Sequence, residues 1–156
     1  MSEKIQILSK NQIDTKKIAL KTAPLFQSGD LIILDGDLSA GKTHFVKGFT
    51  EGFQSEDLVT SPTFSIANFY RTGQFDILHI DLYRIKTIEE FNDLGLTDYF
   101  DQSVVCIEWG TKFADYFDDY MLISFESKGD NERLITFAGN SDKYNSIIDS
   151  LKNILC

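Results

Sequence analysis

One short stretch of the chain combines glycines, a lysine and a threonine at a spacing that suits phosphate binding. It reads Gly36-Asp37-Leu38-Ser39-Ala40-Gly41-Lys42-Thr43, with the pattern G-x-x-x-x-G-K-[ST]. The glycines allow the backbone to turn so that successive amide groups point at one anion. Lys42 can reach the β- and γ-phosphates of a nucleotide, and the Thr43 hydroxyl can bind the Mg²⁺ that bridges them. We therefore expect this loop to bind a nucleotide through its amides and these two side chains.

The residues on both sides of the loop fit a strand before it and a helix after it. Residues 30–35 form a short apolar run of the kind that makes a buried strand. After the loop, Phe45, Val46, Phe49 and Phe53 recur at helical spacing. A helix that begins at the loop adds the partial positive charge of its N-terminus to the phosphate site. This context favours a phosphate-binding loop over a glycine-rich turn that binds nothing.

Two acidic residues follow apolar runs and are candidates for the chemistry of hydrolysis. Asp81 follows the run 77–80, and Glu108 follows the run 104–107. Ligands of α/β proteins gather beyond the carboxyl ends of strands, where an acid can bind Mg²⁺ or orient a water molecule. Either acid could instead be the first exposed residue after a strand. The pattern does not decide which of the two would orient the water.

Three further residues are weaker candidates. Thr63 lies between the loop and Asp81 and could bind Mg²⁺ in the triphosphate state, although it could also simply begin a strand. Trp109 is the only tryptophan, and it would face away from its neighbour if the strand continued, in the core or against a partner. Asn11, or Gln12 beside it, could approach the edge of an adenine, or could lie in a solvated turn.

The two histidines are expected to pack rather than react. His79 shares a strand face with Asp81 and could donate a hydrogen bond to it, but a packed strand histidine is the more common case. His44, directly after Thr43, is expected on the surface or against a neighbouring helix.

Hydrophobic periodicity predicts the remaining elements. We expect a strand near residues 5–8 and a helix that begins at Asp14 or Thr15 and ends near Phe26, shortened or kinked by Pro24. Apolar and polar residues alternate over 64–71 and 75–82, which indicates a β-hairpin.

The second half of the chain continues the alternation of helices and strands. Thr87 can cap a helix that runs towards Phe100, and Ser141 can cap a final amphipathic helix. Strands are expected at 103–109, 119–127 and 132–138. The whole chain, residues 1–156, is predicted to be a single α/β domain: a three-layer P-loop NTPase-like fold with a mixed β-sheet.

Composition limits the class of partner and the compartment. The 156 residues are 42% hydrophobic and carry a net charge of −9, so disorder and direct binding to nucleic acid are both disfavoured. The N-terminal residues have no apolar signal core, and no apolar run has membrane-spanning length, so no membrane role is expected. Cys106 and Cys156 suggest free thiols in a reducing compartment, and we expect a cytoplasmic protein.

Four blocks of the sequence together resemble the bacterial TsaE family, also called YjeE. They are Gly36–Thr43, Ser61-Pro62-Thr63-Phe64, His79-Ile80-Asp81-Leu82-Tyr83-Arg84 and Ile107-Glu108-Trp109. The resemblance implies a small ATPase, with ATP and Mg²⁺ as cofactors, that acts in the biosynthesis of threonylcarbamoyladenosine in tRNA. It also implies that the TsaD and TsaB proteins are the partners and that tRNA is reached only through their complex.

The same resemblance implies roles for individual residues. Thr43 and Glu108 would bind Mg²⁺, while Asp81, Thr63 and Trp109 would serve hydrolysis or its coupling to the partner complex. Position 39 departs from the family because it is Ser where Gly is usual, but only its amide is needed for phosphate. His44 stands where the family usually has a second Thr or a similar residue.

Two other classes of P-loop protein are the alternatives. A small-molecule kinase normally clamps two anionic substrates with several arginines, whereas this chain has only Arg71, Arg84 and Arg133 and no basic lid segment. A GTP-dependent switch would need an N-K-x-D motif for the guanine base, and the sequence has none.

Overall fold

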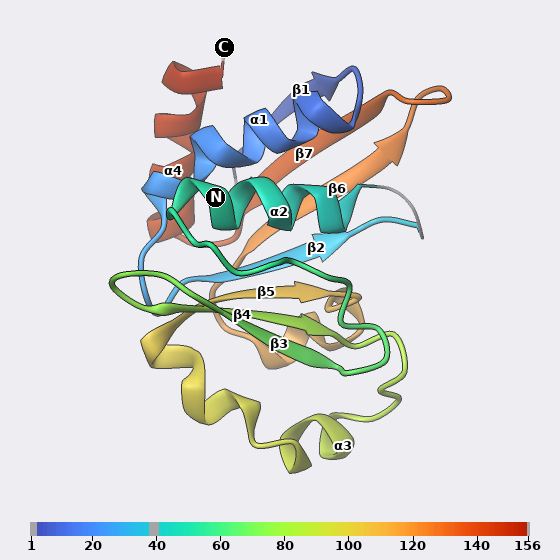
Figure 1. Cartoon of the computed structure of the whole chain (residues 1–156), viewed down its shortest axis with the longest axis vertical. Helices are drawn as coiled ribbons and strands as arrows, with labels where there is room; N and C mark the ends of the chain where they lie inside the picture. Colours follow the sequence, from blue (N-terminus) through green and yellow to red (C-terminus); the bar gives the residue numbers. More distant parts are fainter. Residues whose placement is uncertain (1–2, 38–40, 156) are drawn as a thin grey trace.

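A seven-stranded mixed sheet forms the centre of the computed structural model, which describes residues 3–37 and 41–155. The strand order is β1-β7-β6-β2-β5-β4-β3 (Figure 1). The strands are β1 (Glu3–Ser9), β2 (Leu31–Asp35), β3 (Ala67–Arg71), β4 (Asp76–Asp81), β5 (Ser103–Glu108), β6 (Met121–Ser127) and β7 (Arg133–Gly139). Strands β6, β2, β5 and β4 run parallel to one another, while β1, β7 and β3 pair antiparallel with their neighbours. The predicted mixed sheet and the predicted hairpin of β3 and β4 are confirmed.

The middle strands are apolar because both of their faces are covered. All six residues of β5 and the first four of β2 are buried. Parallel strands that are buried on both faces have continuous apolar runs instead of alternating ones. The apolar run before the predicted loop forms β2, and the run that ends at Glu108 forms β5. These two strands pair with each other in the middle of the sheet.

Helices cover both faces of the sheet and complete the three predicted layers (Figure 1). On one face lie α1 (Gln12–Thr22), α2 (Lys42–Gly52) and α4 (Asp142–Leu155), packed on a core that includes Phe45 and Phe49. On the other lie α3 (Ile88–Asp93) and the 3₁₀ segments η2 (Leu96–Gln102) and η3 (Thr111–Tyr116), around Phe91. Within the described ranges, no helix combines the length and the apolar character needed to span a membrane.

Two predicted helix boundaries are wrong. Asn11, and not Asp14 or Thr15, caps α1, because its side chain accepts a hydrogen bond from the Asp14 amide at 2.8 Å. The helix predicted to reach Phe100 stops at Asp93, where Gly95 adopts a left-handed conformation with φ 71° and the chain continues as 3₁₀ turns.

Of the other two predicted helix caps, one is confirmed and one is wrong. Thr87 caps α3 as predicted, with its hydroxyl accepting from the Glu90 amide at 3.1 Å. The Ser141 hydroxyl is buried without a hydrogen-bond partner in the described part of the chain, so this predicted side-chain cap is wrong. Pro24 shortens α1 as expected, and residues Ala23–Leu25 form the 3₁₀ turn η1.

Candidate active site

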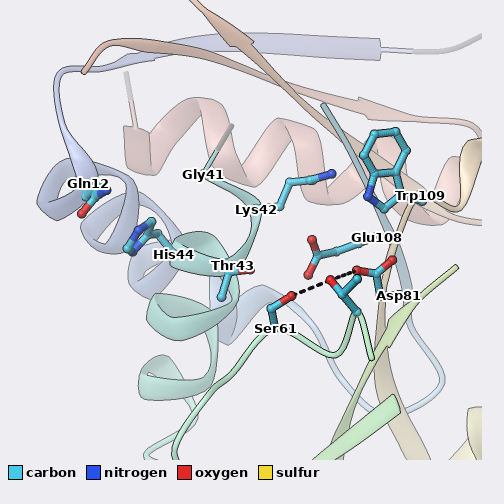
Figure 2. A pocket seen from close by; sticks show the side chains of 10 residues that line it. Gln12, Gly41, Lys42, Thr43, His44, Ser61, Asp81, Glu108 and Trp109 are labelled. Carbon is cyan, nitrogen blue, oxygen red and sulfur yellow. Dashed lines mark hydrogen bonds between the residues drawn. The ribbon is translucent and has the colours of Figure 1, made fainter. Parts of the chain in front are cut away.

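The carboxyl ends of β2, β4 and β5 meet at one edge of the sheet, beside the N-terminus of α2. A pocket of about 300 Å³ opens there (Figure 2). Its lining residues are Gln12, Gly41, Lys42, Thr43, His44, Ser61, Thr63, Asp81, Glu108 and Trp109. The fold therefore brings together the loop residues and the candidate residues 63, 81, 108 and 109, which were predicted from four separate parts of the sequence.

The described part of the phosphate-binding loop has the expected backbone. Gly36 and Gly41 both have positive φ, 148° and 104°, and Lys42 begins α2 directly after Gly41. Glycine adopts such conformations without the cost that a side chain adds. Asp37, which was predicted to bind the nucleotide, is exposed and lines neither this pocket nor the smaller pocket beside it. Leu38, Ser39 and Ala40, which were predicted to bind phosphate through their amides, lie outside the described residues.

Lys42 is the cation of the pocket and is itself 4% exposed. Its Nζ atom donates to the Gly36 carbonyl at 2.8 Å and lies 4.0 Å from the centre of the Trp109 ring. Burial lowers the pKa of Lys42, while the negative charges of Glu108 and Asp81 oppose that shift. A buried ammonium group with these surroundings is a strong binding site for a phosphate oxygen.

The two candidate acids are direct neighbours in the sheet. Asp81 and Glu108 are partners in the parallel register of β4 and β5, and both are nearly fully buried, at 2% and 4% exposure. Neighbouring strands lie about 4.8 Å apart, so two carboxylates at this spacing can both reach one ion or one water molecule. Sequence spacing alone could not show this pairing.

The two acids differ in how their oxygens are used. Both oxygens of Asp81 accept hydrogen bonds, from the Thr63 hydroxyl and from the Tyr83 amide, each at 2.8 Å. Glu108 uses one oxygen, Oε2, which lies 2.6 Å from Nε2 of His79. The structure gives its Oε1 no donor among residues 3–37 and 41–155. Glu108 is therefore the acid with an oxygen available for a new ligand.

His79 is packed as expected, but its partner differs from the predicted one. It is completely buried, and it contacts Glu108 on β5 instead of Asp81 on its own strand. Glu108 is a diagonal neighbour of His79 on the adjacent strand, and diagonal neighbours about 7–8 Å apart are within reach of long side chains.

Trp109 and His44 also differ from their predicted surroundings. Strand β5 ends at Glu108, and Trp109 has φ 60°, so the strand alternation that would turn its ring away from Glu108 does not apply. Trp109 and Glu108 line the same pocket, and the centre of the Trp109 ring lies 5.1 Å from that of the Tyr83 ring. His44 lines the pocket as well, where surface or helix packing was expected.

Ser61 is the residue that sequence reasoning missed. Its hydroxyl lies 2.9 Å from that of Thr63, which in turn donates to Asp81. Figure 2 shows the Ser61 side chain directed towards Asp81 and Glu108 from the loop before β3. The available signal was its position two residues before Thr63, because alternate residues of an extended segment point the same way.

A second pocket adjoins the first. It has a volume of about 170 Å³ and is lined by Asn11, Gln12, Thr15, Gly41, His44, Asp130, Asn131 and Arg133. Gln12, Gly41 and His44 line both pockets, so the two pockets lie side by side. Asn11, predicted near an adenine, lies in this second pocket, where its side-chain oxygen already caps α1.

The oxygen donors of the first pocket fit Mg²⁺. In the described ranges, no three His, Cys, Asp or Glu side chains form a metal cage. The pocket offers instead the Thr43 hydroxyl and the carboxylates of Glu108 and Asp81. Mg²⁺ in nucleotide sites is usually held by one or two carboxylates together with phosphate oxygens and water, so this small set of hard oxygen donors is appropriate.

Comparison with known proteins agrees with the motifs. A family model described as "Threonylcarbamoyl adenosine biosynthesis protein TsaE" matches residues 9–135. The tRNA threonylcarbamoyladenosine biosynthesis protein TsaE of Bacillus subtilis is 40% identical over 143 residues, which are 90% of this chain and 89% of that protein. The protein of the same name from Treponema pallidum is 35% identical over 136 residues, 86% of this chain and all of that protein. The crystal structure of Bacillus subtilis YdiB superposes with a TM-score of 0.81 at 31% identity, over 98% of this chain and 97% of the other.

Proposed function

Because this chain belongs to the TsaE family, we propose that it is a Mg²⁺-dependent ATPase subunit that acts in the biosynthesis of threonylcarbamoyladenosine in tRNA. One observation supports the ATPase part most strongly. The buried Lys42 of a phosphate-binding loop faces Asp81 and Glu108, which are register partners on adjacent strands. Such a pocket combines a cation for the phosphates with acids for a metal ion and for water.

ATP would lie across both pockets. The amides of the loop and Lys42 would bind its phosphates in the first pocket, next to the positive end of α2. The nucleoside would then extend past Gly41 and His44 into the second pocket, which the loop between β6 and β7 helps to line. The two adjoining volumes support a nucleotide as the ligand over a small anion.

Thr43 and Glu108 are the residues proposed to hold Mg²⁺, because they offer a hydroxyl and a carboxylate oxygen into the pocket. When bound, Mg²⁺ would neutralise charge on the phosphates as the terminal bond breaks. Asp81 would hold Thr63 in place through the hydrogen bond at 2.8 Å and would accept a hydrogen bond from the attacking water. Trp109 packs on Lys42 and would keep that cation shielded from solvent.

Two exposed aromatic side chains next to pocket residues support a partner protein, proposed to be the TsaD–TsaB complex. Phe64, directly after Thr63, is 86% exposed, and Tyr83, which contacts Trp109, is 52% exposed. Exposed aromatics beside a site are typical of protein interfaces. A partner that covers them would also exclude water from the pocket, so ATP hydrolysis is expected to be weak alone and faster in the complex, in the cytoplasm.

The small-molecule kinase alternative gains no support from the arginines. Arg71 pairs with Asp57, and Arg84 lies against Phe64; neither lines the two pockets described above. Arg133 lines only the second pocket, where the nucleoside is proposed to lie. A clamp on a second anionic substrate would need such side chains directed into the pocket that holds Lys42.

The proposal is tested by measuring ATP binding and hydrolysis with the purified chain, alone and with TsaD and TsaB. We expect binding of Mg·ATP by calorimetry, slow phosphate release alone and faster release in the complex. Absence of Mg·ATP binding at millimolar nucleotide would show that the proposed function is wrong. Transfer of phosphate to a nucleoside or metabolite would instead support the kinase.

A further inference from the structure

A continuous row of buried polar groups leads from the edge of the sheet to Glu108. The Tyr70 hydroxyl on β3 lies 3.0 Å from Nδ1 of His79 on β4, and Nε2 of the same ring lies 2.6 Å from Glu108 Oε2 on β5. Tyr70 is 2% exposed and His79 is completely buried. Polar groups are costly to bury, and here each has a partner, so the row forms one connected arrangement.

The sheet register places these three side chains on one face. His79 pairs with Asn68 on β3 and with Cys106 on β5. Tyr70 and Glu108 lie two residues beyond those partners, and residues two apart on a strand share a face. Both are therefore diagonal neighbours of His79, on the face that packs against α2, where Tyr70 and Cys106 join the core of Phe45 and Phe49.

The direction of the bond to Glu108 follows from the donors available. An ionised carboxylate only accepts hydrogen bonds, so Nε2 of His79 must carry the proton in the contact with Oε2. Nδ1, on the other side of the ring, faces the phenol of Tyr70, which can donate or accept. With its two nitrogens facing Tyr70 and Glu108, the ring has one orientation, and that orientation fixes Oε2 of Glu108, which lines the pocket.

We propose that His79 is a positioning residue that holds Glu108 in the orientation needed to bind Mg²⁺, with Tyr70 fixing the histidine ring. This inference rests on the proposed function. A carboxylate that binds a metal is commonly oriented by a donor on its other oxygen, and loss of such a donor typically weakens metal binding about 10- to 100-fold. His79 lines neither of the two pockets, so its effect must pass through Glu108.

Tyr70 also connects this arrangement to the loop that carries Thr63. Its hydroxyl lies 3.0 Å from the Thr60 carbonyl, directly before Ser61. The phenol has one proton to donate, to this carbonyl or to Nδ1 of His79, so Tyr70 lies between the segment with the Ser61 and Thr63 hydroxyls and the histidine that contacts Glu108. Movement of that segment would reach Glu108 through two side chains.

The test compares nucleotide binding with Mg²⁺ and in excess chelator, using a non-hydrolysable ATP analogue. Trp109 is the only tryptophan and lines the pocket, so its fluorescence reports binding, and calorimetric stoichiometry reports the folded fraction. The measured quantity is the ratio of the two affinities. His79→Leu removes the donor with little change in volume, His79→Gln restores an amide donor, and Tyr70→Phe removes only the hydroxyl.

We expect His79→Leu to lower the ratio about 10- to 100-fold, with unchanged affinity in chelator. His79→Gln should recover part of the loss, and Tyr70→Phe should lower the ratio about 3- to 10-fold. Ile77→Val serves as the matched control, because Ile77 shares the face of His79 but is apolar, and its ratio should equal that of the wild type.

The outcomes separate the inference from the proposed function. If Mg²⁺ does not strengthen binding by the wild-type chain, the proposed function itself is wrong. If it does, and His79→Leu and Tyr70→Phe keep the wild-type ratio while melting at lower temperature, His79 is only a packing residue and the inference is overturned. Should His79→Leu fail to fold, a wild-type ratio in both His79→Gln and Tyr70→Phe overturns it, and a reduced ratio in Tyr70→Phe supports it.

Discussion

At the scale of single residues, Lys42 combines burial with proximity to two acids. Its ammonium group is held by the Gly36 carbonyl and the Trp109 ring, so little reorganisation is needed when a phosphate arrives. Burial lowers the pKa of Lys42, which means that the free pocket does not fully stabilise its charge. A phosphate oxygen supplies the missing negative partner.

Replacement of this lysine should therefore abolish nucleotide binding. We expect Lys42→Ala to weaken binding of Mg·ATP at least about 100-fold, because charge-assisted contacts to two phosphates disappear. Calorimetric titration measures the loss. Lys47→Ala on the same helix is the control, since Lys47 lines neither of the two pockets around Gly41. Equal binding by both variants would contradict the role of Lys42.

Glu108 should affect the metal-dependent part of the reaction more than nucleotide binding itself. Glu108→Gln keeps the shape of the side chain but removes the charge that attracts Mg²⁺. We expect affinity for nucleotide in chelator to be retained and hydrolysis with Mg²⁺ to fall at least about 10-fold. Phosphate release over a series of Mg²⁺ concentrations measures this. The exposed Asp93→Asn variant is the control, and normal turnover of Glu108→Gln would exclude the metal-ligand role.

At the scale of elements, the position of α2 depends on its close approach to α1. A Cβ atom added at Gly48 would lie 2.2 Å from the Lys16 carbonyl oxygen, and one at Gly52 would lie 2.9 Å from the Leu20 carbonyl oxygen. The two helices can approach this closely only because α2 has glycine at these positions. Since α2 begins at Lys42, its placement also sets the position of the phosphate site.

Gly48→Ala should accordingly destabilise the fold, because backbone atoms of α1 cannot move aside as a flexible side chain could. We expect a loss of about 1–3 kcal/mol in the free energy of unfolding, measured by urea denaturation. Gly73→Ala is the matched control, because no atom of the described residues lies within 4 Å of an added Cβ there. Equal stability of the two variants would show that α1 and α2 are not held by this contact.

The loop between α2 and β3 is fastened to the edge strand by Asp57 and Arg71. The Asp57 carboxylate accepts from the Arg71 amide at 2.6 Å and from its guanidinium at 3.1 Å. These hydrogen bonds lower the pKa of Asp57. The folded state therefore favours the charged carboxylate, so the stabilisation is present above the ordinary pKa of aspartate and is lost as pH falls through the lowered value.

This sign gives a pH-dependent prediction. Asp57→Asn should lower the melting temperature at about pH 7, and the difference from the wild type should shrink once the pH falls below about 4. Thermal melts across this range measure it. In the Asp57→Asn background, Arg71→Ala should cost less than it does alone. A difference that stays constant with pH would contradict the ion pair as its cause.

The same elements show how far sequence reasoning reaches. The strands β2 and β5 were predictable because a continuous apolar run closed by an acid is typical of a buried parallel strand in an α/β chain. The hairpin of β3 and β4 followed from alternation around a glycine turn. Asp81 and Glu108 were found because each closes an apolar run, whereas the phosphate loop was found from the spacing of its glycines, lysine and threonine.

Other features depend on strand register and on backbone angles, which the hydrophobic pattern of the sequence does not show. The diagonal contact of His79 with Glu108 depends on the register between two parallel strands, which apolar runs do not encode. The inward turn of Trp109 depends on one residue with φ 60°. The early end of α3 depends on the left-handed conformation of Gly95, whereas the apolar spacing of Leu94 and Leu96 continued beyond it.

At the scale of the whole molecule, the net negative charge of the chain disfavours direct binding of tRNA. The chain carries 24 acidic and 15 basic residues, a net charge of −9. A protein gains affinity for nucleic acid by placing Lys and Arg against phosphates and releasing counterions. An acidic surface instead repels the tRNA backbone, so the partner complex is expected to provide the tRNA contacts.

The isolated chain should therefore fail to bind tRNA where basic proteins bind it non-specifically. At roughly 0.15 M salt we expect no filter retention at protein concentrations up to about 100 µM, the weak end of ordinary non-specific binding. Weak electrostatic binding through a few lysines would give retention that vanishes as salt rises. The titration is therefore repeated at lower salt, to separate such weak binding from direct recognition of tRNA. In the presence of TsaD and TsaB, retention of tRNA should appear and should increase with the concentration of those proteins. Micromolar binding by the chain alone that persists at high salt would mean that it recognises tRNA directly, and the division of labour proposed for the complex would be wrong.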